Sequence, residues 1–160
     1  MKTSVKAIPE GYHTVTPCLS VKDSLKAITF YEKAFGAKKL GVFPSPDGKH
    51  TMHAAIKIGD SILMMGDEMS DTECKSAETL GASPISLYVY VPNADAVFKQ
   101  AIDAGAIVTM PMADMFWGDR CGAVKDLFGY SWMIATHCRD LTDKEMQEGA
   151  EAFFATTAKP

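Results

Sequence analysis

Histidine is the side chain in this sequence best suited to acid–base chemistry or metal binding, and the chain has four of them. No two of them form an H-x-H pair, which would share one strand face, or an H-x-x-x-H pair, which would share one helix face. His53 is the best candidate for a catalytic or ligand-binding histidine, because strand alternation places it with Thr51 and Ala55 on an inward face. The alternative is a histidine that is merely packed and hydrogen-bonded. The sequence therefore leaves the catalytic residues unknown, with His53 as a weak candidate.

A second group with chemical potential lies in residues 112–120, which we expect to form a loop closing over a binding site. Arg120 could grip a carboxylate or phosphate, and Trp117 could stack on a flat ligand. The alternative is structural: Arg120 would pair with Asp119 or Asp126 to hold the loop, and Trp117 would be buried at a dimer contact.

The elements that must position these side chains occur twice in the sequence. Each half has an apolar strand, an amphipathic helix that ends at glycine, and three further strands, and Gly59 in the first half recurs as Gly129 in the second. The first half is predicted as strand 16–23, helix 24–35 and strands 39–43, 51–58 and 61–65. The second is predicted as strand 86–91, helix 94–104 and strands 106–110, 121–128 and 131–135. The chain is therefore predicted to consist of two βαβββ modules.

The bulk properties exclude several classes of protein. The 160 residues are 47% hydrophobic and 22% charged, and the net charge of −4 comes without a basic stripe, which argues against nucleic acid or an anionic membrane as a partner. Uninterrupted apolar runs are shorter than the roughly 20 residues of a membrane span. The four cysteines lack CxxC spacing and no secretory signal is present, so we expect reduced thiols and a cytoplasmic location.

Three motifs resemble a known family. Residues 23–37 resemble its first-helix signature, residues 53–60 its "HAEIKIGD" strand and turn, and residues 118–132 its "GDR.G…DPFG..W" ending. The chain is similar, up to about His137, to the PhnB-like branch of the vicinal-oxygen-chelate superfamily, the glyoxalase/bleomycin resistance/dioxygenase type. The resemblance implies an α+β fold in which two βαβββ modules form a curved mixed-sheet cup. It implies less about function, because the superfamily includes isomerases, dioxygenases, thiol transferases, epimerases and non-catalytic drug-binding proteins.

The resemblance and the repeat together predict a single domain over residues 1–160. Its parts are module one at 12–66, a linker at 67–84, module two at 85–137 and a C-terminal helix at about 142–156. The helix is expected to begin at the capping-box pattern of Thr142 and Glu145, and its apolar stripe is expected to dock on the domain or on a second subunit.

Enzymes of this superfamily commonly hold a divalent metal inside the cup, with ligands from the first and last strands of each module. Alignment of the two halves places the four ligand positions at Thr16, Leu63, Ser86 and Met133. None of these side chains is a good donor for a hard cation, since Leu has no donor atom, Met suits soft metals and neutral hydroxyls bind weakly. The branch pattern also has Glu where this chain has Ala55. We therefore expect no cofactor, and disfavour a divalent metal.

The leading hypothesis is a protein that binds a small, partly apolar molecule in its cup without the usual metal. The predicted ligand-binding residues are Thr16, His53, Ser86, Tyr88, Trp117, Arg120 and Met133. One alternative is an enzyme, a glyoxalase-like lyase or isomerase or a dioxygenase, with an unusual metal set or none. Another is a non-catalytic dimerisation domain. A homodimer is expected in any case, and the sequence leaves open whether modules pair within one chain or between two.

Overall fold

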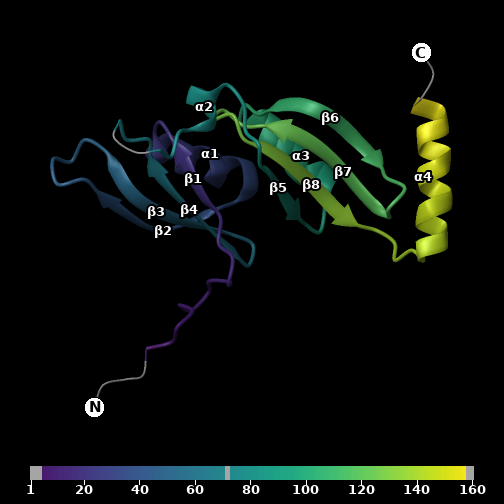
Figure 1. Cartoon of the computed structure of the whole chain (residues 1–160), viewed down its shortest axis with the longest axis horizontal. Helices are drawn as coiled ribbons and strands as arrows, with labels where there is room; N and C mark the ends of the chain where they lie inside the picture. Colours follow the sequence, from purple (N-terminus) through teal and green to yellow (C-terminus); the bar gives the residue numbers. More distant parts are fainter. Residues whose placement is uncertain (1–4, 71–72, 158–160) are drawn as a thin grey trace. The chain divides into compact units, whose positions relative to one another are not determined.

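The computed structural model describes residues 5–70 and 73–157, and the chain divides into two compact units (Figure 1). Unit 1 contains the chain up to Pro84 together with Leu127–Gly129. Unit 2 contains Ile85–Asp126 and the chain from Tyr130 onward. Each unit has one four-stranded mixed sheet. In the described part of the chain, no helix is long and apolar enough to cross a membrane.

Unit 1 is the first predicted βαβββ module. Its elements are β1 (Cys18–Val21), α1 (Ser24–Phe35), β2 (Lys38–Pro44), β3 (Thr51–Ile58), β4 (Ser61–Asp67) and α2 (Ala77–Leu80), with sheet order β1-β4-β3-β2. Helix α1 begins where the side chain of Asp23 accepts a hydrogen bond from the backbone of Lys26. It ends at Gly36, whose φ of 64° lies in the left-handed region that glycine adopts without strain.

The stretch predicted as a linker is structured at both ends. Asp67 belongs to β4, and Ser76 is the N-cap of α2; its hydroxyl donates to Glu68 over 2.6 Å. Thr79 donates to the same carboxylate oxygen over 2.7 Å. These hydrogen bonds, with that from Ser76 the strongest, lower the pKa of Glu68 to about 2. A charged carboxylate therefore holds the start of α2 at neutral pH.

Unit 2 repeats the same order. Its elements are β5 (Ser86–Tyr90), α3 (Ala94–Asp103), β6 (Ile107–Asp114), β7 (Asp119–Lys125), β8 (Ser131–His137) and α4 (Asp143–Thr157), with sheet order β5-β8-β7-β6. Asn93 caps α3 as Asp23 caps α1. The predicted α+β fold with two βαβββ modules is thereby confirmed.

The prediction of a loop over residues 112–120 is wrong about the length of the loop. Its ends belong to strands β6 and β7, and only the four residues between them form a turn. The turn is closed by hydrogen bonds from the backbone of Met115 to Asp119 and from Gly118 to Met115. Gly118 has a φ of 96°, which favours glycine. The segment is therefore a hairpin rather than a long closing loop.

Helix α4 begins with the predicted capping box. The backbone nitrogen of Thr142 donates to the Glu145 carboxylate over 2.8 Å, and the Glu145 nitrogen donates to the Thr142 hydroxyl over 3.3 Å. Farther along, the rings of Phe153 and Phe154 lie 5.6 and 6.5 Å from the ring of Phe116 in the hairpin turn. The helix thus docks on its own unit through an aromatic cluster.

Each sheet has one covered and one open face. In unit 2, a Cβ added at Gly122 would lie 2.7 Å from the Phe98 ring, so this side of β7 faces α3. Because side chains alternate along a strand and paired residues share a face, the opposite side is the open face. Its residues are Ser86, Tyr88 and Tyr90 on β5, Ser131, Met133, Ala135 and His137 on β8, and Asp119, Cys121 and Ala123 on β7.

Candidate functional site

The most concentrated group of polar side chains in unit 2 is centred on Asp119, the first residue of β7. Its carboxylate is almost fully buried and accepts four hydrogen bonds. One oxygen accepts from the hydroxyls of Tyr88 and Tyr90, over 3.1 and 3.0 Å, and from the indole nitrogen of Trp117, over 3.1 Å. The other oxygen lies 2.8 Å from Nδ1 of His137. One buried carboxylate thus connects the hairpin turn with three strands of the open face.

The sheet order explains why these residues meet. Strand β8 lies between β5 and β7, and Asp119 pairs with His137 at the last position of β8. Tyr88 pairs with Met133 and Tyr90 with Ala135 on the other side of β8. The long tyrosine side chains extend along the open face to a carboxylate two strands away.

The hydrogen bonds determine the charge state of the site. Burial by itself raises the pKa of Asp119, but the hydrogen bonds from His137, Tyr90, Tyr88 and Trp117 outweigh it, and the net pKa is lowered. The pKa of His137 is raised by Asp119 and then by Asp140, which lies 3.1 Å from Nε2. Burial raises the pKa of Tyr88 and, with the bond to Asp119, that of Tyr90. At neutral pH the site therefore contains a carboxylate and neutral phenols.

Beside this cluster, unit 2 has a cavity of about 400 Å³. It is lined by Asp114, Met115, Gly118, Asp119, Cys138 and Arg139. The turn between β6 and β7 forms one wall, and the chain that leaves β8 forms another. The cavity thus lies against the buried carboxylate, and its volume is within the range of small-molecule sites.

The structure brings several of the predicted ligand-binding residues together. Tyr88 and Trp117 meet at Asp119, and Ser86 and Met133 lie on the same open face. Sequence reasoning did not select Asp119, Tyr90 or His137. Strand alternation places Tyr90 on the same face as Tyr88. The sheet order adds His137, whereas Asp119 falls in the segment that the sequence predicts as a loop.

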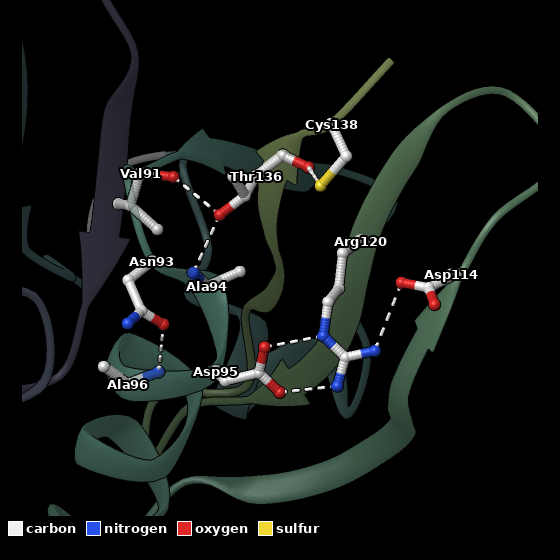
Figure 2. A network of polar contacts seen from close by, with 9 residues as sticks. All are labelled: Val91, Asn93, Ala94, Asp95, Ala96, Asp114, Arg120, Thr136 and Cys138. Carbon is white, nitrogen blue, oxygen red and sulfur yellow. Dashed lines mark hydrogen bonds and ion pairs between the residues drawn. The ribbon is translucent and has the colours of Figure 1, made fainter.

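Arg120 lies on the other side of the sheet. Its guanidinium donates to both oxygens of Asp95 on α3, over 2.6 Å each, and to Asp114 over 3.2 Å (Figure 2). The expectation that it pairs with Asp119 or Asp126 is therefore wrong. Asp119 is the preceding residue of the strand and points to the opposite face. The Asp126 carboxylate instead accepts from the Tyr130 nitrogen and the Trp132 indole. In the same view, Thr136 donates to the Val91 carbonyl and accepts from the Ala94 nitrogen, which fixes the start of α3 to β8.

The remaining predicted residues belong to unit 1. His53 on β3 is half-buried and lies 6.1 Å, ring to ring, from Phe43 on β2. Thr16 lies just before β1, and its hydroxyl donates to the His13 carbonyl. Neither side chain has a buried acidic partner among the described contacts. In unit 1 the predicted residues are thus dispersed, whereas unit 2 gathers its polar residues around one carboxylate.

The position assigned to Leu63 needs a correction. Leu19 and Val21 are the buried residues of β1, and Leu19 pairs with Met65, so Leu63 shares the covered face. Met64 faces the open side and pairs with Cys18, as Met133 pairs with Tyr88 in unit 2. The residue of unit 1 that corresponds to Met133 is therefore Met64.

This correction does not supply a ligand set for a hard cation. The four positions now hold Thr16, Met64, Ser86 and Met133, two neutral hydroxyls and two thioethers. In the described ranges, no three His, Cys, Asp or Glu side chains are grouped as metal ligands would be. The residues present do not fit the divalent metal of the superfamily's enzymes.

Comparisons with known proteins agree with the fold. Residues 12–134 match the model of the Glyoxalase/Bleomycin resistance protein/Dioxygenase superfamily. The uncharacterized protein Rv0887c of Mycobacterium tuberculosis is 38% identical over 136 residues, which are 83% of this chain and 79% of that protein.

Solved structures give the same result. TioX from Micromonospora sp. ML1 is 25% identical, with a TM-score of 0.60 over 81% of this chain and 100% of TioX. A PhnB protein from Bacillus cereus is 18% identical, with a TM-score of 0.61 over 78% of this chain and 99% of its own, and this likeness concerns the fold. The match to the family model spans both modules, and the chain therefore belongs to the glyoxalase/bleomycin resistance protein/dioxygenase superfamily.

Proposed function

We propose that this protein binds a small, partly apolar molecule on the open face of unit 2, without the divalent metal of its enzymatic relatives. The observation that carries the proposal is the lining of that face. Sulfur-containing and aromatic side chains surround a single buried carboxylate whose hydrogen bonds hold Tyr88 and Trp117 in place. Fixed polar groups within an apolar surface are typical of small-molecule sites.

The apolar part of this surface is contiguous. Met115, Cys121 and Ala135 are buried together, and Met110, Ala113, Trp117 and Met133 pack on them while remaining partly accessible. A ligand that covers the four partly accessible side chains removes apolar area from water, at about 25 cal/mol per Å². The flexible thioether of Met133 can adjust to ligands of different outline. The surface therefore supplies a driving force for binding, and the fixed phenols and indole supply orientation.

A thermal-shift and tryptophan-fluorescence screen tests this proposal. Both tryptophans of the chain, Trp117 and Trp132, lie in unit 2, so the fluorescence reports on this unit alone. A ligand present at 100 times its dissociation constant should stabilise the protein by about 2.7 kcal/mol. Met133→Lys should abolish the response, whereas Lys99→Ala, on the exposed side of α3, should leave it unchanged. An unchanged response in Met133→Lys would contradict the proposal.

Metal analysis tests the second part of the proposal, which is that binding needs no divalent metal. Purified protein should contain no stoichiometric Zn, Ni, Mn or Fe, and a chelator should leave ligand affinity unchanged. A stoichiometric metal that is required for binding would contradict the metal-free proposal, because donors other than the four aligned residues would then have to hold it.

One observation favours a second candidate, an enzyme that transfers a proton. His137 is oriented through Nδ1 by the buried Asp119, while its Nε2 lies 3.1 Å from the carboxylate of the fully exposed Asp140. A histidine oriented by a carboxylate is a common arrangement for a general base. Screening against small keto acids tests this candidate: turnover that is lost in His137→Gln while folding is retained would favour the enzyme, and absence of turnover would favour binding alone.

A further inference from the structure

We infer that the ligand of this face is an organic cation, whose ammonium or guanidinium group lies against the rings of Tyr88 and Tyr90. This inference rests on the proposed function and specifies the chemical class of the ligand. It follows from the geometry of the tyrosine pair, from the carboxylate behind it and from the charges around it.

The two tyrosines form an accessible aromatic surface. Their ring centroids are 5.0 Å apart at an interplanar angle of 35°. The exposed fractions are 46% for Tyr88 and 60% for Tyr90, high values for aromatic residues in the middle and at the end of a strand. Aromatic faces carry negative electrostatic potential and attract cations within about 6 Å of the ring centroid. The pair thus presents two such faces side by side.

The buried carboxylate strengthens this attraction. Both hydroxyls donate to the same oxygen of Asp119, over 3.1 and 3.0 Å. A phenol that donates to a carboxylate has more electron density on its oxygen and ring than a phenol that donates to water, so its face attracts a cation more strongly. The same two bonds restrain both rings, which reduces the entropy that a ligand would otherwise lose in ordering them.

The charges around the pair also favour a cation. Two carboxylates, Asp119 and Asp140, flank His137, the one residue of the Asp119 cluster that can carry a positive charge. The guanidinium of Arg120 is paired with two carboxylates on the covered side of the sheet. Unit 2 as a whole contains more Asp and Glu than Lys and Arg. Arg139 is the one cationic residue that lines the neighbouring cavity, and two carboxylate residues, Asp114 and Asp119, line it as well. An anionic ligand would therefore meet more repelling than attracting groups.

The test compares choline with 3,3-dimethylbutan-1-ol, which has the same shape without the charge. Binding to the full chain is followed by tryptophan fluorescence and calorimetry. Cation–π attraction of the usual size at an exposed site predicts that choline binds about two- to fivefold more tightly than the neutral alcohol. Tyr90→Leu should remove this preference, while Phe43→Leu, an equally exposed aromatic residue on β2 of unit 1, should retain it. Tyr90→Phe, which keeps the ring and loses the bond to Asp119, should retain part of it.

Each outcome has a defined meaning. Equal affinity for choline and the alcohol, or a preference that survives in Tyr90→Leu, would overturn the inference. If neutral apolar probes bind and choline does not, the inference fails while the proposed function stands. If no probe of any charge gives a response, both fail. Circular dichroism of each variant verifies that the fold is retained; Tyr90→Leu leaves Asp119 with three of its four donors.

Discussion

Replacing Asp119 by Asn tests whether this carboxylate organises the open face of unit 2. The substitution preserves side-chain shape but leaves one carbonyl oxygen and an amide group where two charged oxygens stood. An amide oxygen can accept two hydrogen bonds, whereas Tyr88, Tyr90, Trp117 and His137 all donate to the carboxylate in the native protein. Two of the four bonds are therefore lost.

At about 1 kcal/mol for each lost bond, the substitution should destabilise unit 2 by about 2 kcal/mol. Removal of a buried charge returns part of its desolvation cost, so the value is an upper estimate. Since the pKa of Asp119 is lowered in the folded protein, its contribution is present above the unfolded value of about 3.9 and is lost as pH falls through the folded value. The difference between the two proteins should therefore persist at pH 6 and diminish below about pH 4.

Urea unfolding followed by tryptophan fluorescence measures the effect, because both tryptophans belong to unit 2. With a slope of about 2 kcal/mol/M, the midpoint should fall by about 1 M. Asp140→Asn is the matched control, since Asp140 is fully exposed and contacts His137 at the surface; its midpoint should not change measurably. Equal midpoints for Asp119→Asn and the native protein, or an equal fall in the control, would refute the central role of Asp119.

Three further predictions concern the same unit. Gly122→Ala should destabilise it by about 1–3 kcal/mol, measured by urea unfolding, because the new Cβ would lie 2.7 Å from the Phe98 ring. Thr142→Ala should cost the start of α4 about 1 kcal/mol, seen as faster amide hydrogen exchange in its first turn and not in β7. The pKa of His137 is raised by Asp119 first, so its contribution to stability is present below pH 6.5 and is lost as pH rises through the folded value. Between pH 6 and 8 the urea midpoint of the native protein should fall more than that of His137→Gln, and parallel profiles would contradict this assignment.

The elements of the fold could be predicted because their signals are local. The caps at Asp23 and Asn93 lie beside the helices they begin, and Gly36 lies at the end of its helix. Each of these residues acts within one turn of its neighbours, so a single sequence contains the whole interaction. The repeat of the order βαβββ then predicted both modules and their strands.

The site could be predicted only in part. The length of the preceding turn determines which side chains of a strand point to the open face of the sheet. The turn between β3 and β4 contains two residues, Gly59 and Asp60, whereas the turn between β7 and β8 spans residues 126–130. Sequence alignment of the two glycine turns therefore matched Leu63 with Met133, although these residues lie on opposite faces of their sheets. A difference of one residue in register exchanges the two faces of a strand, and the sequence alone did not reveal it.

The sequence by itself determined the family, the order of the elements and the residue types that would line an open sheet face. Local propensities and patterns suffice for these, since they act over a few residues. Only the tertiary structure decided which side chains meet. Asp119 lies about 30 residues from the tyrosines and 18 from His137, and they become neighbours because β8 inserts between β5 and β7. Strand order is a property of the whole sheet, and so is the carboxylate-centred site that it assembles.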